Sequence, residues 1–411
     1  MKIIFLTHYY PPEVNAPATR VSEMAQHWVE EGHDVTVVTC APNHPRGKLF
    51  PGYRNRLFQK ECVDGINVIR VWTYMAANQG VGKRLLSYLT YPVSVLINRH
   101  RLLKADLVIS TSPQFFCGLA GWLLQTRNTP WILEIRDLWP ESISAVGAIK
   151  HGPAIRFLQR LERWAYRTAD MIVSVTDSFT THIRALAPDT PIAVIKNGVN
   201  LAKFVPATAQ LAAQTREELQ LTDKLVAGYV GTHGMVHGLD TILEAAEILR
   251  DHDTISFIMV GDGAEKDRLE ATAAAKGLKN IRFLGQRPRA DIPRIWSSLD
   301  VSLVLLRRSD TFKSVLPSKM FEAFAFEKPV ILGVEGEARD LLDDAGAGIA
   351  IQPENAAQLA AALLTLAGDA ELREQLGRSG REFALQHFDR GTLANTYLEV
   401  MQEVVHQAQT K

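Results

Sequence analysis

The sequence predicts an α/β protein made of two doubly wound, parallel-sheet domains of the Rossmann-like kind. Short β-branched apolar runs alternate with longer helical patterns, as expected of parallel strands covered by helices on both faces. The alternation occurs twice, once in each half of the chain. A length of 411 residues is also enough for two domains with separate cores.

The predicted strands are buried apolar runs, most of them followed by a helical stretch. In the first half they are Lys2–Leu6, Val35–Thr39, Asn67–Trp72, Leu107–Ser110, Trp131–Ile135, Met171–Val175 and Ile192–Ile195. In the second half they are Leu225–Val230, Ser256–Val260, Ile281–Leu284, Val301–Leu305, Val330–Leu332 and Gly348–Ile351. Residues 376–407 favour helix almost without interruption.

The boundary between the domains is expected within residues 196–224, a polar, proline-containing stretch without strand character. We assign residues 1–200 to the first domain and residues 201–388 to the second, with a last helix near 389–411 packing back on the first. Charge supports a division, because residues 1–190 contain 21 Lys and Arg against 15 Asp and Glu, whereas the rest contains 24 against 30. Ligands of such sheets bind at their carboxyl ends, so the active site is expected in a cleft that both domains face.

Composition narrows the function. The 45 basic and 45 acidic side chains balance, which argues against a nucleic-acid partner held by a general electrostatic field. Cys40, Cys62 and Cys117 lack metal-binding or redox spacing and indicate a reducing compartment. The apolar runs 3–6 and 85–97 are too short for a signal peptide core and a membrane span, respectively. We expect a cytoplasmic protein with at most peripheral membrane contact, and predict no metal and no cofactor.

The most informative segment is Leu316–Ala325, which follows a predicted strand. Ser318 is suited to opening a helix, and Lys319 adds a positive charge at the helix end that attracts anions, which predicts a phosphate site. Glu322 lies one turn further on, where a carboxylate can accept both hydrogen bonds of a ribose diol. The alternative is a capped surface helix with an intrahelical Lys–Glu pair.

With these features, the chain resembles the nucleotide-sugar-dependent glycosyltransferases of family 4, which have the two-domain GT-B fold. The likeness runs through nearly the whole chain and includes the bacterial branch that builds O-antigen, capsule and exopolysaccharide on a lipid carrier, L-fucosamine transferases among them. The segments that carry it are Tyr9–Glu13, Glu31–Thr39, Arg136–Ser142, Lys196–Asn200, Val260–Gly263 and Phe283–Gly285.

The resemblance implies an acceptor-side first domain and a second domain that binds the nucleotide sugar. The implied reaction is retaining transfer of a sugar from a nucleotide diphosphate donor, most simply UDP-linked, to an acceptor on polyprenyl diphosphate. The departing diphosphate needs cationic stabilisation, which is assigned to Lys319 and Arg136, and the third catalytic residue, Asp137, is assigned to the incoming hydroxyl. Two alternatives stay open: a GT-B epimerase or hydrolase of sugar nucleotides, and a non-catalytic partner subunit.

Two parts of the family pattern are missing. Members commonly have a glutamate eight positions before the one that matches Glu322, and this chain has Ser314 there. Members also place an Arg and a Lys in the loop after the first strand of the second domain, where this chain has Thr232 and His237. Backbone amides of that loop are expected to cradle the diphosphate, with Lys319 supplying the missing charge.

Other residues are assigned to the substrates with a structural alternative beside each. The loop residues expected at the donor are Gly231, Thr232, His233, Gly234 and His237, the last contributing charge if protonated. Gly261 either lets a phosphate approach or forms a plain turn, and Arg287 either contacts the nucleobase or is solvated.

In the first domain, Glu13, Asn15 and Arg20 are assigned to the acceptor side, and Arg20 and Arg136 to acceptor phosphate or donor diphosphate. Asp137 is expected to orient the acceptor hydroxyl. The alternative for Arg136 and Asp137 is that they brace the hinge between the domains.

Residues 83–104 have an unusual composition. Between Asp64 and Asp106 the chain has no acidic residue and six Lys or Arg, and residues 83–104 add a broad apolar face with Tyr88 and Tyr91. This pattern predicts a surface that contacts the inner face of the cytoplasmic membrane and a lipid-linked acceptor. The alternative is a core-packing helix with basic ends.

Overall fold

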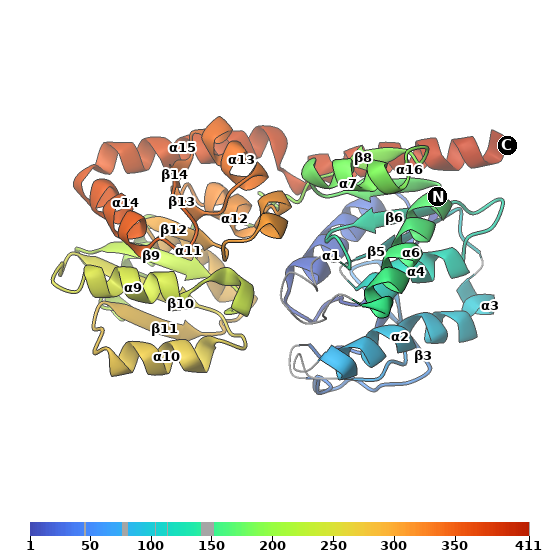
Figure 1. Ribbon diagram of the computed structural model, residues 1–411, viewed down its shortest axis with the longest axis horizontal. Helices are drawn as coiled ribbons and strands as arrows, with labels where there is room; N and C mark the ends of the chain where they lie inside the picture. Colours follow the sequence, from blue (N-terminus) through green and yellow to red (C-terminus); the bar gives the residue numbers. More distant parts are fainter. Residues whose placement is uncertain (45–46, 76–80, 103, 113, 141–151, 411) are drawn as a thin grey trace. The chain divides into compact units, whose positions relative to one another are not determined.

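The computed structural model describes residues 1–44, 47–75, 81–102, 104–112, 114–140 and 152–410. The chain forms two compact units, shown in Figure 1. Unit 1 consists of Met1–Asn197 and Arg390–Lys411, and unit 2 consists of Gly198–Asp389. Each unit is a doubly wound sheet with helices on both faces, which confirms the predicted fold class.

Unit 1 contains an eight-stranded sheet in the order β3-β4-β2-β1-β5-β6-β7-β8. Its strands are β1 (Lys2–Leu6), β2 (Asp34–Cys40), β3 (Phe58–Val63), β4 (Ile66–Val71), β5 (Leu107–Thr111), β6 (Trp131–Ile135), β7 (Met171–Ser174) and β8 (Ile192–Val194). All neighbours are parallel except β3 and β4. The predicted strands therefore form one sheet, extended by the hairpin strand β3, which we did not predict.

The connections of unit 1 place its helices on two faces. The helix α1 (Ala16–Glu30) joins β1 to β2, which lies toward the β3 edge of the sheet. The connections from β4 through β8 lead toward the opposite edge. Because both kinds of crossover are right-handed, α1 and the helices of the later connections lie on opposite faces of the sheet. The second layer contains α2 (Val81–Ile97), α3 (Arg99–Leu102), α4 (Phe115–Leu119), η1 (Ala120–Leu123), α6 (Pro153–Thr168) and α7 (Ser178–Leu186). Two separate apolar cores fill the spaces between these layers and the sheet.

The last helix, α16 (Arg390–Thr410), packs beside α1 in unit 1. Trp28 of α1 meets Tyr397 of α16 edge to face, with ring centroids 5.4 Å apart. The Trp28 indole nitrogen donates to the Ala394 carbonyl at 3.0 Å. An aromatic pair and a satisfied buried indole thus hold the end of the chain on unit 1.

Unit 2 contains a six-stranded parallel sheet in the order β11-β10-β9-β12-β13-β14. Its strands are β9 (Leu225–Val230), β10 (Ile255–Val260), β11 (Ile281–Gly285), β12 (Val301–Leu305), β13 (Val330–Gly333) and β14 (Gly348–Ala350). Its helices are α8 (Ala209–Glu218), η2 (Met235–His237), α9 (Asp240–Ile248), α10 (Lys266–Ala275), η3 (Arg289–Asp291), α11 (Ile292–Ser298), η4 (Asp310–Ser314), α12 (Lys319–Ala325), α13 (Glu337–Ala345), α14 (Ala356–Gly368) and α15 (Ala370–His387).

The strand order of unit 2 reverses at β9. The chain proceeds from β9 to β10 and β11 on one side, then crosses to β12 on the other side of β9. Such a reversal opens a crevice at the carboxyl ends of the two central strands, where doubly wound sheets bind ligands. A ligand-binding site is therefore expected at the segments that follow β9 and β12.

Candidate active site

The segments after β9 and β12 meet at this crevice, and glycine makes the meeting possible. Gly231 directly follows β9 with φ +148°, and a Cβ atom on it would lie 2.3 Å from Cε of Lys319. Gly261 follows β10 with φ +135°, and its Cβ would lie 1.9 Å from the Gly231 carbonyl oxygen. Larger residues would displace the lysine or the loop. Close packing against the Gly231 carbonyl thus explains why position 261 is a glycine.

Lys319 begins α12 and is half-buried at this crevice. Its Nζ donates to Tyr229 Oη at 2.9 Å and lies 4.5 Å from the centroid of the same ring. Tyr229 Oη in turn donates to the Thr232 carbonyl at 2.7 Å. Burial lowers the pKa of Lys319 to about 8, against the attraction of Glu322. The result is a mainly protonated lysine hydrogen-bonded to a neutral phenol rather than to a carboxylate.

The two histidines of the loop after β9 are neutral. His237 Nδ1 lies 3.2 Å from the Gly234 carbonyl, so this nitrogen carries the proton. Burial and the charge of Lys319 lower the pKa of His237 to about 2, and burial lowers that of His233 to about 4. The condition under which His237 would add positive charge, protonation of its ring, is therefore not met, because a desolvated imidazole beside an ammonium does not hold a second proton.

The other predicted donor residues occupy different settings. Ser318 has helical backbone angles and its hydroxyl makes no capping hydrogen bond, so the predicted cap is not formed. Glu322 is half-buried one turn beyond Lys319. Arg287 is exposed after the edge strand β11, which is separated from β12 by the two strands β10 and β9. The structure thus brings Lys319, Glu322 and the loop of Gly231 together, and leaves Arg287 at the sheet edge.

Arg20 of unit 1 forms a closed set of hydrogen bonds. Its Nε and Nη2 donate to Glu134 Oε2 at 3.2 and 3.0 Å, in a pair that is almost fully buried. The remaining donors reach the carbonyls of residues 195 and 196 and the side chain of Asn197, at 3.0 to 3.1 Å. All five guanidinium N–H groups are used. Our assignment of Arg20 to a substrate phosphate is therefore wrong.

Glu13 and Asn15 also make structural hydrogen bonds. The buried Glu13 carboxylate accepts from the amides of Asn43, His44 and Tyr10, at 2.9, 2.8 and 3.4 Å. Asn15 caps α1 by accepting from the Ala18 amide at 2.9 Å. These bonds shape the loop after β1, so any contact of Glu13 with an acceptor competes with them.

Arg136 follows β6 and differs from Arg20. Its Nε and Nη1 are buried and meet no hydrogen-bond partner among the residues that the structure describes. Burial lowers the pKa of Arg136 to about 10, against the attraction of Glu134. Asp137 lies beside it, half-buried. Glu141 and Ser142, which end the same motif, lie outside the described residues. Arg136 is thus a charged group with donors left for an anion.

Two family models match the chain. Residues 212–383 match the glycosyl transferases group 1, and residues 15–198 match a glycosyl transferase 4-like domain. Together these ranges include most of both units. The chain belongs to the GT-B glycosyltransferases of family 4.

A relative agrees with this membership, and solved structures share the fold. The chain is 26% identical over 410 residues to the Escherichia coli protein WcaI, named as a colanic acid biosynthesis glycosyl transferase, covering 97% of this chain and 99% of that protein. Sucrose-phosphate synthase from Thermosynechococcus elongatus has the same fold, with a TM-score of 0.78, 19% identity and 99% of each chain covered. Anabaena HepE in complex with UDP has a TM-score of 0.71, 17% identity and 98% and 100% covered.

Two residues of this glycosyltransferase escaped sequence analysis. Tyr229, which holds Lys319, lies inside the apolar run of β9 and was counted only as core. Glu134, the partner of Arg20, lies inside β6 in the run Trp-Ile-Leu-Glu-Ile. A carboxylate within a buried strand requires a partner, so Glu134 was the available signal. A tyrosine one residue before a strand end carries no comparable signal.

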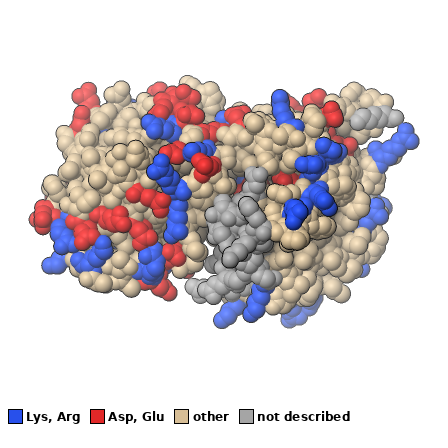
Figure 2. Space-filling model, viewed as in Figure 1, with Lys and Arg blue, Asp and Glu red and all other residues tan. Residues whose placement is uncertain are grey.

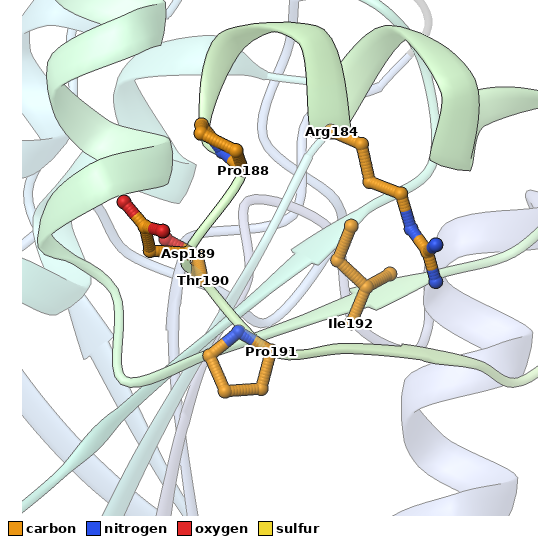
Figure 3. Close-up of a pocket in the computed structure, with 6 residues that line it drawn as sticks. All are labelled: Arg184, Pro188, Asp189, Thr190, Pro191 and Ile192. Atoms are coloured by element: carbon orange, nitrogen blue, oxygen red, sulfur yellow. The ribbon is translucent and has the colours of Figure 1, made fainter.

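A surface hollow of about 350 Å³ in unit 1 is not part of this site. Arg184, Pro188, Asp189, Thr190, Pro191 and Ile192 line it (Figure 3). These residues run from the last turns of α7 to the first residue of β8, at the amino end of an edge strand. Ligands of doubly wound sheets bind at the opposite ends of the strands.

Within the described ranges, no group of three or more His, Cys, Asp or Glu side chains could hold a metal ion. No helix in the described part of the chain is long and apolar enough to cross a membrane.

Proposed function

We propose that the protein is a retaining glycosyltransferase that moves a sugar from a UDP-sugar to a saccharide on a polyprenyl diphosphate carrier, in the synthesis of a bacterial surface polysaccharide. Support for the pathway comes from the likeness to WcaI. Support for the carrier comes from a Campylobacter jejuni relative named as an N,N'-diacetylbacillosaminyl-diphospho-undecaprenol α-1,3-N-acetylgalactosaminyltransferase, 24% identical over 258 residues, which are 61% of this chain and 65% of that protein.

The observation that carries the proposal is Lys319 at the crevice of unit 2. When the bond between the sugar and the β-phosphate oxygen breaks, negative charge develops on the departing diphosphate. We assign its stabilisation to Lys319 and to the amides of Thr232 and Gly234, since neither amide donates to a backbone carbonyl within the described residues. Fixed donors aimed at developing charge need no reorganisation during the reaction.

The remaining roles follow from the chemistry of the substrates. Glu322 accepts the hydroxyl hydrogens of the ribose. Arg136 binds phosphate through its unpartnered donors, and Asp137 orients the acceptor hydroxyl. The departing phosphate takes the hydroxyl proton, so no covalent enzyme nucleophile is assigned.

The functional test compares donor consumption with and without a lipid-linked acceptor. A transferase consumes UDP-sugar and labels the lipid only when the acceptor is present. A hydrolase or epimerase converts the UDP-sugar without the acceptor. A non-catalytic subunit neither consumes the UDP-sugar nor labels the lipid. Screening nucleotides by thermal stabilisation selects the donor, because a ligand at 100 times its Kd adds about 2.7 kcal/mol to the unfolding free energy. Greater stabilisation by GDP or ADP than by UDP contradicts the UDP assignment.

The membrane assignment rests on an apolar stripe on α2. Leu86, Leu89, Val93, Leu96 and Ile97 are 40 to 56% exposed, at spacings that keep them on one side of the helix. We call them the α2 stripe. The two tyrosines of the helix point inward instead: both are buried, and Tyr91 Oη donates to the Val38 carbonyl at 2.7 Å.

The expectation of tyrosines on the contact surface is therefore wrong, whereas leucine, isoleucine and valine side chains are available to it. Lys83, Arg99, Arg101 and Lys104 are exposed near the α2 stripe. We assign this surface to the inner face of the cytoplasmic membrane. Replacing Lys83, Arg84, Arg99 and Arg101 by glutamine should abolish cosedimentation with anionic liposomes and leave UDP affinity unchanged. Unchanged liposome binding contradicts the assignment.

A further inference from the structure

The helix α6 presents a second basic surface on the same side of the unit 1 sheet as α2. Arg156, Arg160, Arg163 and Arg167 recur at four- and three-residue intervals and are all exposed, which places them on one side of the helix. Figure 2 shows Lys and Arg side chains gathered over α6. We call α6 with its exposed side chains the α6 face.

Large aromatic side chains adjoin these arginines. Phe157 is 63% exposed and Trp164 is 37% exposed, and they lie about two turns from each other along the same flank of α6. Trp122 of η1 is 45% exposed and meets Trp164 edge to face, with ring centroids 5.1 Å apart. Because η1 also packs against α2, the α6 face and α2 belong to one continuous helical layer.

The acidic residue of α6 itself does not neutralise the α6 face. Glu162 is the one acidic residue in the sequence of α6, and its side chain is only 2% exposed. It faces the protein interior, where its Oε1 lies 3.0 Å from His182 Nε2. The exposed side of α6 therefore carries positive charge and aromatic surface together.

We propose that the α6 face and Trp122 bind an anionic lipid bilayer as a second contact, separate from the α2 stripe. The proposal rests on the membrane assignment above and adds an orientation: the layer from α2 to α7 lies on the lipid side of the unit 1 sheet, and α1 and α16 lie on the other. Arginine is attracted to lipid phosphates, and tryptophan prefers the interface between headgroups and acyl chains. The α6 face has both properties, and the α2 stripe lies in the same helical layer.

The first test is cosedimentation with vesicles of phosphatidylcholine and phosphatidylglycerol, compared with phosphatidylcholine alone. The triple variant R156Q/R160Q/R163Q should bind the anionic vesicles about tenfold more weakly or worse, because three charges near the surface are lost. The matched control R250Q/K279Q/R378Q removes the same charge from exposed positions of unit 2 and should bind as the wild type does. UDP affinity should be unchanged in both.

The second test follows the tryptophans directly. Brominated lipids should quench wild-type fluorescence on anionic vesicles, and the variant W122F/W164F should lose most of that quenching. Wild-type vesicle binding by the triple variant, or equal quenching with and without these two tryptophans, overturns the inference. If only the α2 variant loses binding, the α6 contact is refuted and the membrane assignment survives. Failure of the wild type to bind vesicles refutes both, whereas a normal response to UDP leaves the donor assignment intact.

Discussion

Units 1 and 2 share a doubly wound architecture but differ in how the cations at the carboxyl ends of their sheets are paired. In unit 1, every N–H group of the Arg20 guanidinium donates a hydrogen bond to Glu134 or to the segment 195–197. In unit 2, Lys319 has a neutral phenol as its partner and a pKa lowered to about 8 by burial. A cation that is fully paired supports the fold, whereas one that is desolvated and paired only with a neutral group gains from an incoming anion.

Arg136 tests whether this distinction depends on the unit or on the pairing. It belongs to unit 1, near Glu134, yet its Nε and Nη1 lack partners among the described residues. If pairing decides, Arg136 should behave as Lys319 does and unlike Arg20. The predictions below separate the two explanations.

The largest effect is expected for Arg20→Ala. It leaves the Glu134 carboxylate buried without its partner, which should lower the unfolding free energy by about 3 to 5 kcal/mol. Urea unfolding measures this loss. The UDP affinity of the folded fraction of Arg20→Ala should be unchanged. By comparison, Arg136→Ala should lower the unfolding free energy less and lower the turnover number more. A stable Arg20→Ala protein with weakened UDP binding contradicts the comparison.

Lys319→Ala should have the next largest effect. Removing a charged donor from the departing diphosphate should reduce kcat about 100-fold or more. His237→Ala is the matched control, because this neighbouring imidazole is neutral and donates to the Gly234 carbonyl. Steady-state kinetics compare the two, with unfolding monitored in parallel. Equal losses, or a larger loss for His237→Ala, indicate that a different group holds the diphosphate.

These contrasts show which features sequence alone could predict. The central strands were predicted because each is an apolar run buried on both sides. The strand β3 was missed because Gln59, Lys60 and Glu61 interrupt its pattern at the sheet edge, although the turn Asp64–Gly65, with φ of 51° and 79°, is a hairpin signal.

The site divides in the same way. Lys319 was predicted because a charge at the start of a helix after a strand has a local meaning. The roles of Arg20 and Arg136 could not be separated, since their partners are set by tertiary contacts with residues far along the chain, such as Asn197. Sequence identifies the charged group, but only the fold determines how many of its donors are used.

Glu322→Ala tests the part of the unit 2 site that should bind the ribose of UDP without a positive charge. Loss of a carboxylate that accepts two ribose hydroxyls should weaken UDP binding by about 1.5 to 3 kcal/mol. Isothermal calorimetry measures the affinity, and Glu337→Ala on α13 is the control carboxylate. The melting temperature should change little. Unchanged UDP affinity in the folded variant removes Glu322 from the ribose.

The smallest effect is a pH dependence that only an incompletely paired lysine can produce. The pKa of Lys319 is lowered to about 8 in the free protein, and a bound diphosphate should raise it, because the anion stabilises the ammonium. Below this pKa the lysine is charged in both states, so UDP affinity should be constant near pH 7. Above it, the free protein has lost the proton that binding requires. UDP affinity should therefore fall by up to about tenfold per pH unit.

Arg20 cannot cause such a decline, because a guanidinium stays charged throughout this range. Calorimetric titrations from about pH 7 to about pH 9.5 should show the alkaline decline in the wild type and a flat profile in Lys319→Ala. Lys319→Arg should also be flat, since its charge persists. The histidines do not interfere, because the pKa values of His233 and His237 are lowered to about 4 and about 2. A decline that persists in Lys319→Ala assigns the titration to another group. That group, rather than Lys319, would then be the cation that distinguishes unit 2 from unit 1.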